Sequence, residues 1–132
     1  MLGNLISDTT GKRVLRRVLS GDPLKVEVSF EETGTTLGIP ITGFGTYSSI
    51  ARADGTIYGE GEGVLTTADG ELVTWKGSGL GKFGPAGSVS YRGILYYRTA
   101  SQKLAALNTV GGVFEYDVDP EGKSRTRSWE WK

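Results

Sequence analysis

Hydrophobic and polar residues alternate along most of this chain with a period of two, the pattern of strands that have one buried and one exposed face. Most of these segments are separated by short connections rich in glycine, aspartate and proline, which are typical of tight turns. The pattern predicts about eight strands, at residues 11–19, 24–37, 41–52, 56–67, 71–83, 87–99, 110–119 and 123–131. Because tight connections join most of them, we expect successive strands to be antiparallel neighbours.

An antiparallel meander of this size removes its exposed edges by closing into a barrel. We therefore predict an all-β fold, an up-and-down, calycin-like antiparallel β-barrel of about eight strands that occupies residues 1–132 as a single domain. One segment departs from the pattern. In "ASQKLAALN", Ser101 is placed as an N-cap and Leu104 and Leu107 lie three residues apart, which predicts a short helical turn near 101–108. We expect this turn to cover one barrel mouth with its leucines directed inward.

The stretch "YGEGEGVLTTADGELVTWKGSGLGKF", residues 58–83, has glycine at alternate positions on both sides of an Asp-Gly turn. Two registers are possible, and they differ by one residue, which exchanges the two faces of each strand. A two-residue loop at 69–70 directs Glu60 and Glu62 inward, as a pair of carboxylates suited to acid–base catalysis. A three-residue loop at 68–70 turns both glutamates outward, places a lysine opposite one of them, and leaves glycines and apolar residues inside.

We favour the second register, because burying two carboxylates without a cation costs on the order of several kcal/mol. The preceding hairpin supports it, since a three-residue loop sets Tyr47 opposite Gly61, where an aromatic ring compensates for the missing side chain. The predicted interior of the two central strands is Ile57, Gly59, Gly61, Gly63, Leu65, Val73, Trp75, Gly77, Gly79, Gly81 and Phe83. Neighbouring strands add Val26, Val28 and Phe30, then Val89, Tyr91, Gly93, Leu95 and Tyr97, and Phe114, Tyr116 and Val118. The last strand stays undecided, because its tryptophans share a face with arginines: Trp129 and Trp131 with Arg125 and Arg127.

Composition and charge exclude several kinds of function. Fifteen basic and fifteen acidic residues cancel, so we expect no nucleic-acid partner. The chain has no cysteine and no histidine, which excludes disulfides, thiolate or imidazole metal ligation and Ser-His-Asp catalysis, and we expect no metal and no other cofactor. No apolar stretch approaches the length of a membrane span, and the N-terminal residues lack a basic region followed by an apolar run. We therefore expect a cytoplasmic protein with no membrane partner.

Two clusters of basic residues would form a stripe if the two end segments of the chain pair. They are Lys12, Arg13, Arg16 and Arg17, and Lys123, Arg125 and Arg127. Such a stripe could attract an anion, although solvated outer strand faces explain the same pattern, and we favour that explanation. Acidic residues also alternate along the seventh predicted strand and its turn. By the same reasoning we interpret them as outward carboxylates that face the basic C-terminal strand: Glu115, Asp117, Asp119 and Glu121.

The inward aromatic residues are the best candidates for function, because their rings line apolar space while a polar group can orient a ligand. Six glycines on the inner face of the central hairpin leave volume that large side chains, water or a ligand must fill. Both a filled core and a ligand cavity are compatible with eight strands. Glu32 is in phase with Val28 and Phe30, so it is the candidate interior acid or base, unless a bulge at "EETGTT" turns it outward. The predicted ligand-binding residues are Tyr47, Trp75, Tyr91, Tyr97, Tyr116, Gly61 and Gly79.

The glycine-alternating central strands are followed by "YRGILYYRTASQKLAALNTVGGVFEYDV", residues 91–118, in which a "KLAAL" turn links two late strands. This layout resembles the allene oxide cyclase-like β-barrel superfamily, which includes dirigent-like proteins and uncharacterised bacterial groups. The resemblance implies a barrel cavity that acts as a mould for a reactive apolar substrate, and assembly into a homodimer or homotrimer. No catalytic residue of the family matches a position in this chain.

Three kinds of function are consistent with these patterns. The first, which we favour, is binding of a small apolar or aromatic molecule in the barrel cavity. The second is a cofactor-free isomerase or cyclase, in which the shape of the barrel and a hydroxyl or carboxyl group position the substrate. The third is a structural or assembly protein with a filled barrel that associates through exposed aromatic residues such as Tyr96, Trp129 and Trp131.

Overall fold

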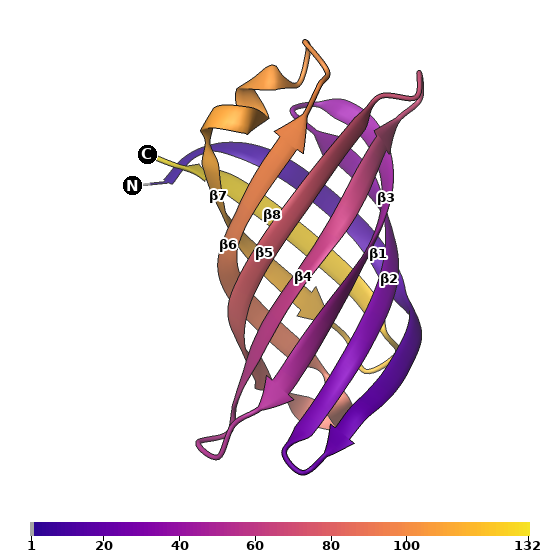
Figure 1. Ribbon diagram of the computed structural model, residues 1–132, viewed down its shortest axis with the longest axis vertical. Helices are drawn as coiled ribbons and strands as arrows, with labels where there is room; N and C mark the ends of the chain where they lie inside the picture. Colours follow the sequence, from indigo (N-terminus) through magenta and orange to yellow (C-terminus); the bar gives the residue numbers. More distant parts are fainter. Residues whose placement is uncertain (1) are drawn as a thin grey trace.

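The computed structural model describes residues 2–132, and the eight strands of this part of the chain form one closed antiparallel barrel. The strands follow one another around the barrel in chain order, and the first closes it by pairing with the last (Figure 1). Their bounds are β1 Leu2–Gly21, β2 Leu24–Thr36, β3 Ile39–Ala51, β4 Thr56–Thr67, β5 Leu72–Phe83, β6 Val89–Thr99, β7 Gly111–Val118 and β8 Lys123–Trp131. The predicted fold class is confirmed, although β1 begins at Leu2 rather than at residue 11. None of the described helices is long and apolar enough to cross a membrane.

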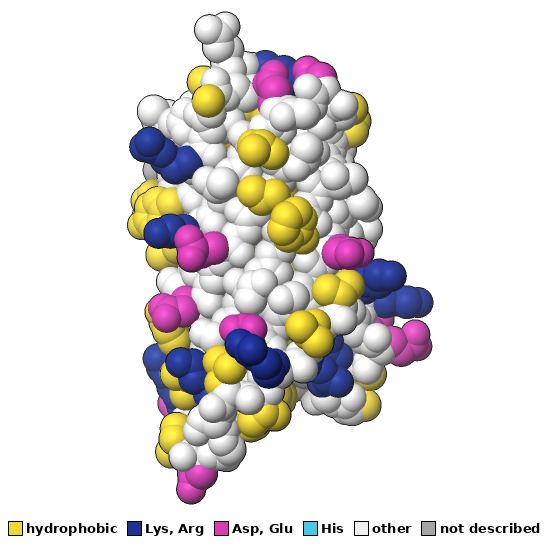
Figure 2. All heavy atoms as spheres, turned by 45° about the vertical axis from the view of Figure 1, so that its right-hand side comes forward, with side chains coloured by type: hydrophobic (Ala, Val, Ile, Leu, Met, Phe, Trp, Pro, Cys, Tyr) yellow, Lys and Arg dark blue, Asp and Glu magenta, His cyan; other side chains and the backbone are white. Residues whose placement is uncertain are grey.

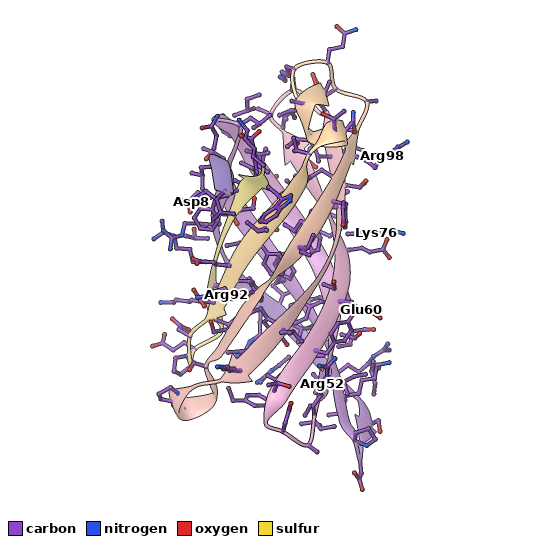
Figure 3. The ribbon with its side chains drawn as sticks, turned by 90° about the vertical axis from the view of Figure 1, so that its left-hand side faces the viewer. Asp8, Arg52, Glu60, Lys76, Arg92 and Arg98 are labelled. Carbon is purple, nitrogen blue, oxygen red and sulfur yellow. The ribbon has the colours of Figure 1, made fainter. Side chains whose placement is uncertain are left out.

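The turn between β4 and β5 has the three-residue form that we favoured. Gly70 has a φ of +85°, a left-handed conformation that glycine adopts without steric cost, and its N–H donates to the carbonyl of Thr67 at 3.0 Å. This turn sets Glu62 opposite Lys76, and the two side chains form an ion pair with 3.6 Å between Oε1 and Nζ. Figure 3 shows Glu60 and Lys76 directed away from the barrel. The predicted register is confirmed, and both glutamates lie outside.

Large side chains lie directly over the inner glycines. A methyl group on Gly63 would overlap the Trp75 ring, and one on Gly59 would come within 2.9 Å of the Tyr91 ring. The same relation holds for Tyr47 over Gly61, Leu95 over Gly77 and Phe114 over Gly79. The glycines are therefore required by close approach of their neighbours, and protein side chains fill most of the space beside them.

The buried side chains form two apolar clusters, one toward each end of the barrel. The cluster at the end that is uppermost in Figure 1 consists of Ile6, Ile41, Leu65, Val73, Leu95, Tyr97, Leu104 and Leu107. The cluster toward the lower end consists of Ile57, Tyr91, Tyr116 and Val118. Phe114 packs against both clusters, so they meet near the middle of the barrel.

The segment between β6 and β7 covers the upper mouth, as predicted (Figure 1). Leu104 and Leu107 are directed inward and are 0% exposed. The helical part is a 3₁₀ helix, η2 (Ala105–Thr109), and a second short 3₁₀ helix, η1 (Pro85–Gly87), lies between β5 and β6.

The predicted N-cap of this turn is wrong. The 3₁₀ helix begins after Leu104, and the buried hydroxyl of Ser101 has no hydrogen-bond partner among the described residues. The side chain of Asn108 instead closes the loop, because it accepts from the N–H of Thr99 at 2.8 Å and donates to the carbonyl of Thr99 at 2.9 Å. A side-chain clamp across the loop therefore replaces the capping bond that we expected.

The last strand, β8, directs small polar residues inward and its tryptophans outward. Ser124 and Ser128 are buried inside the barrel. Trp131 is 64% exposed, and the guanidinium of Arg127 lies 5.6 Å from the centre of the Trp129 ring. The orientation that the sequence left undecided is therefore outward for both tryptophans.

The outer surface carries ion pairs and exposed apolar side chains. The carboxylates of β7 point outward, as predicted, and Glu115 pairs with Arg127 of the C-terminal strand at 3.4 Å. Asp117 instead pairs with Arg92 of β6 at 3.1 Å. Figure 2 shows apolar side chains lying among charged ones on the face that it presents. Phe83, which we predicted inside, is 58% exposed because β5 ends there, beyond the closed part of the core.

Candidate binding site inside the barrel

A cavity of about 80 Å³ lies inside the barrel, and members of both apolar clusters line it. All of the predicted ligand-binding residues contribute to its wall: Tyr47, Trp75, Tyr91, Tyr97, Tyr116, Gly61 and Gly79. Their role in binding stays a prediction. This volume is enough for a few water molecules, but it is smaller than the cavity of about 150 Å³ that holds a benzene molecule in an engineered protein.

Aromatic rings form most of the cavity wall and pack against one another. The ring centroids of Tyr47 and Tyr116 are 5.6 Å apart and those of Phe30 and Tyr116 are 5.7 Å apart. Phe30 also lies 6.2 Å from Trp75, and Tyr47 lies 5.9 Å from Tyr91. These separations fall within the range of favourable ring pairs. The rings thus support one another and define the shape of the wall.

The tyrosine hydroxyls of this wall act as neutral hydrogen-bonding groups. The hydroxyls of Tyr97 and Ser128 are 2.9 Å apart, and those of Tyr47 and Tyr116 are 3.4 Å apart. Burial raises the pKa of Tyr91 to about 12 and that of Tyr97 to about 12. It also raises the pKa of Tyr116 far above its usual value. At neutral pH these hydroxyls are therefore protonated and can donate or accept hydrogen bonds, rather than act as phenolate bases.

Glu32 is the one carboxylate in the cavity wall that is also buried, with 8% of its surface exposed. It lies between Gly11 of β1 and Gly43 of β3, so the directly opposite position on each adjacent strand has no side chain. The hydroxyl of Thr9 donates to Oε1 at 2.6 Å. Among residues 2–132, no lysine or arginine forms an ion pair with it. Its predicted inward orientation is correct, while a catalytic role stays a prediction.

Burial raises the pKa of Glu32, and the hydrogen bond from Thr9 opposes that rise in part. Because Thr9 donates to Oε1, the proton of the acid form resides on Oε2. A carboxyl group in this state can donate a hydrogen bond to a carbonyl or ether oxygen, and it can also transfer a proton. Among the described residues, no group of acidic side chains is arranged to hold a metal ion.

Sequence reasoning missed the smaller, polar part of the cavity wall. Ser7, Thr126 and Ser128 line the cavity, and Thr9 holds Glu32. The first part of β1 was not predicted as a strand because its inward positions include serine and threonine rather than a run of apolar residues. In β8 the sequence did contain a signal for this polar face, because Ser124, Thr126 and Ser128 alternate along the strand and place small polar groups on one side.

No protein-family model matches this sequence, and no curated protein sequence is significantly similar to it. Solved structures with the same fold do exist. A conserved protein of unknown function from Rhodopseudomonas palustris has a TM-score of 0.80 and 16% identity, over 98% of this chain and 97% of that one. A β-barrel-like protein from Acinetobacter baumannii AYE has a TM-score of 0.78 and 14% identity, over 100% and 96%. An enzyme from Penicillium herquei has a TM-score of 0.65 and 16% identity, over 98% and 96%. At these identities the likeness concerns the fold alone.

Proposed function

We propose that the barrel interior binds a small, mostly apolar molecule that carries a hydrogen-bonding group. The observation that supports this proposal is an aromatic cavity whose wall contains one buried carboxyl group, Glu32, without a cationic partner among the described residues. An apolar wall with a few polar groups is the usual composition of ligand pockets. A buried carboxyl with a raised pKa is a feature that clusters at functional sites.

The size of the cavity limits the ligand. A single aromatic ring needs about twice the present volume, by comparison with the engineered benzene cavity of about 150 Å³. We therefore expect a ring to bind only when a wall residue changes its rotamer. Tyr47 is the best candidate, because it is only half buried and its hydroxyl has a single long contact with that of Tyr116, at 3.4 Å.

The three tryptophans provide a test with its own internal control. Trp75 lines the cavity, whereas Trp129 and Trp131 lie on the outer face. Titration with benzyl alcohol, followed by the indole N–H resonances in a ¹H–¹⁵N NMR spectrum, should shift the Trp75 signal in a saturable way. The signals of Trp129 and Trp131 should stay unchanged.

A pair of variants separates binding in the cavity from weak surface binding. Thr126→Leu adds apolar bulk to the cavity wall on β8, whereas Thr74→Leu makes the same change on the exposed face of β5. The first variant should lose the Trp75 response and the second should keep it. If Trp75 never responds, or responds equally in both variants, the proposal is wrong.

A second candidate function is a cofactor-free isomerase or cyclase with Glu32 as the general acid. Two observations favour it: the buried carboxyl has Oε2 available for proton transfer, and one protein of the same fold is described as an enzyme. Native mass spectrometry of protein purified from its own host would detect a bound small molecule. If the protein is an isomerase, the wild type should carry the product and the Glu32→Gln variant should carry the substrate. Substrate and product have equal mass but differ in chromatographic retention. The same compound in both proteins would exclude this role for Glu32.

A further inference from the structure

Arg13 and Arg16 both lie on the inner face of β1, although they are three residues apart. Residues at that spacing in a regular strand lie on opposite faces. A bulge between Arg13 and Leu15 changes the register, so that Arg13 lies opposite Phe30 and Arg16 lies opposite Val28. Phe30 and Val28 are each 5% exposed and face the barrel interior. Because directly opposite residues share a face, the two arginines face inward as well.

The wall of the barrel is open beside these arginines. Strand β8 pairs with β1 only as far as Lys12, and the last backbone bond on that side runs from the N–H of Arg13 to the carbonyl of Gly122 at 2.9 Å. The guanidinium of Arg13 lies against this turn, where a methyl group on Gly122 would be 3.2 Å from Nε. Beyond this point β1 pairs with β2 alone. The two arginines therefore stand at the lower mouth of the barrel, at the end away from η2 (Figure 1).

Among the described residues, these two arginines have no acidic partner, unlike the other three arginines of the two sequence clusters. Three arginines of the same two sequence clusters form ion pairs: Arg17 with Glu27 at 3.1 Å, Arg125 with Asp8 at 3.1 Å, and Arg127 with Glu115 at 3.4 Å. Figure 3 shows Asp8 on the outside of the barrel. Among residues 2–132, neither Arg13 nor Arg16 has a carboxylate within ion-pair distance. The solvated outer face that we favoured thus accounts for the paired arginines but not for these two.

The two arginines lie close to the tyrosine pair of the cavity wall. Arg16, Val28 and Tyr47 occupy neighbouring register positions on β1, β2 and β3. Burial raises the pKa of Tyr47, and the positive charges of Arg13 and Arg16 act in the opposite direction. Tyr47 therefore stands between the cavity and a pair of uncompensated positive charges.

We propose that Arg13 and Arg16 form an anion-binding site at the lower mouth, and that the ligand of the cavity is a small organic acid. Guanidinium groups bind carboxylates and phosphates through paired, charge-assisted hydrogen bonds. Phe30 and Val28, which lie opposite the two arginines, are two and four residues from Glu32, or about 7 to 13 Å along β2. The acid group lies at the arginines, the apolar body lies against Trp75, and a polar group at the other end forms a hydrogen bond with Glu32. This inference rests on the proposed function and adds the charge of the ligand.

A matched pair of probes tests the charge separately from the cavity. Benzoate and benzyl alcohol carry the same ring, but only benzoate is an anion at pH 7. Each is titrated while the Trp75 indole N–H resonance is followed, at low ionic strength because screening weakens exposed charges. Benzoate should bind wild type more tightly than benzyl alcohol. The double substitution Arg13→Gln with Arg16→Gln should weaken benzoate by about tenfold or more and leave benzyl alcohol within about twofold.

Arg17→Gln is the control, because it removes the same charge from the same strand, next to Arg16 but paired with Glu27. It should leave both affinities within about twofold. The ¹H–¹⁵N spectrum reports whether the double variant is folded, and Arg16→Gln alone, at an exposed position, should still weaken benzoate. If benzyl alcohol binds but the arginine variants leave benzoate unchanged, the anion site is wrong and the cavity proposal stands. If neither probe shifts Trp75 in wild type, both proposals fail.

Discussion

At the scale of single residues, Glu32 is the one carboxyl group that is buried among the described residues. Because burial raises its pKa in the folded protein, the folded state keeps its proton at pH values where the unfolded chain has lost it. In the window between the unfolded and the folded pKa, the free energy of unfolding therefore falls as the pH rises. Glu32→Gln removes this dependence. The stability of the variant relative to wild type should increase between pH 4 and pH 7, as measured by urea unfolding.

The neighbouring Glu31 provides the control for this measurement, because it is exposed on the other face of β2. Glu31→Gln should show no such gain in relative stability over the same range. A stability difference between Glu32→Gln and wild type that is constant with pH would contradict the assigned environment.

The inward position of Glu32 was predicted from its phase with Val28 and Phe30. Its hydrogen bond with Thr9 was not predictable, because the pairing of β1 with β2 brings together residues 23 positions apart.

At the scale of elements, the segment between β6 and β7 contributes to stability through its two buried leucines. Leu104 is 0% exposed and packs in the upper cluster, so Leu104→Ala should lower the free energy of unfolding by about 2–5 kcal/mol. Leu72→Ala is the control, since Leu72 is 55% exposed, and it should change the stability by about 0.5 kcal/mol or less. Chemical denaturation measures both. Equal effects would mean that the segment does not seal the barrel mouth.

The elements also show which structural features could be predicted from the sequence. The Asp-Gly turns fixed the register of the central hairpins, because the final glycine of each loop occupies a left-handed position, with φ of +87° at Gly55 and +85° at Gly70. The bulge that brings Arg13 and Arg16 to one face left no local signal, since it depends on how β1 fits β2. For this reason the residues of the proposed anion site were recognisable in the sequence only as part of a basic cluster, which we assigned to solvated outer strand faces.

At the scale of the whole molecule, barrel closure leaves an apolar band on the outside. The band crosses four adjacent strands, because Ile94 of β6 lies opposite Val113 of β7, Val113 opposite Trp129 of β8, and Trp129 opposite Leu5 of β1. Ile94 is 48% exposed and Leu5 is 46% exposed. A continuous apolar surface of this kind is typical of contacts between protein chains. The alternation of β6, β7 and β8 could be predicted from the sequence, but the alignment of the four positions could not, because it requires the first part of β1 and its closing pair with β8.

The expected homodimer or homotrimer is tested at this surface. Sedimentation equilibrium at micromolar concentration should give a mass two or three times that of the chain, which is 14.1 kDa. The double variant Ile94→Ser with Tyr96→Ser removes two exposed apolar side chains from the outer face of β6 and should shift the protein toward monomer. Phe44→Ser is the control, because Phe44 is 63% exposed but lies on β3, on the other side of the barrel. Only the β6 variant removes apolar surface that an interface at the band would bury. A wild-type monomer, or an oligomer that Phe44→Ser disrupts equally, would therefore show that the band is not the interface.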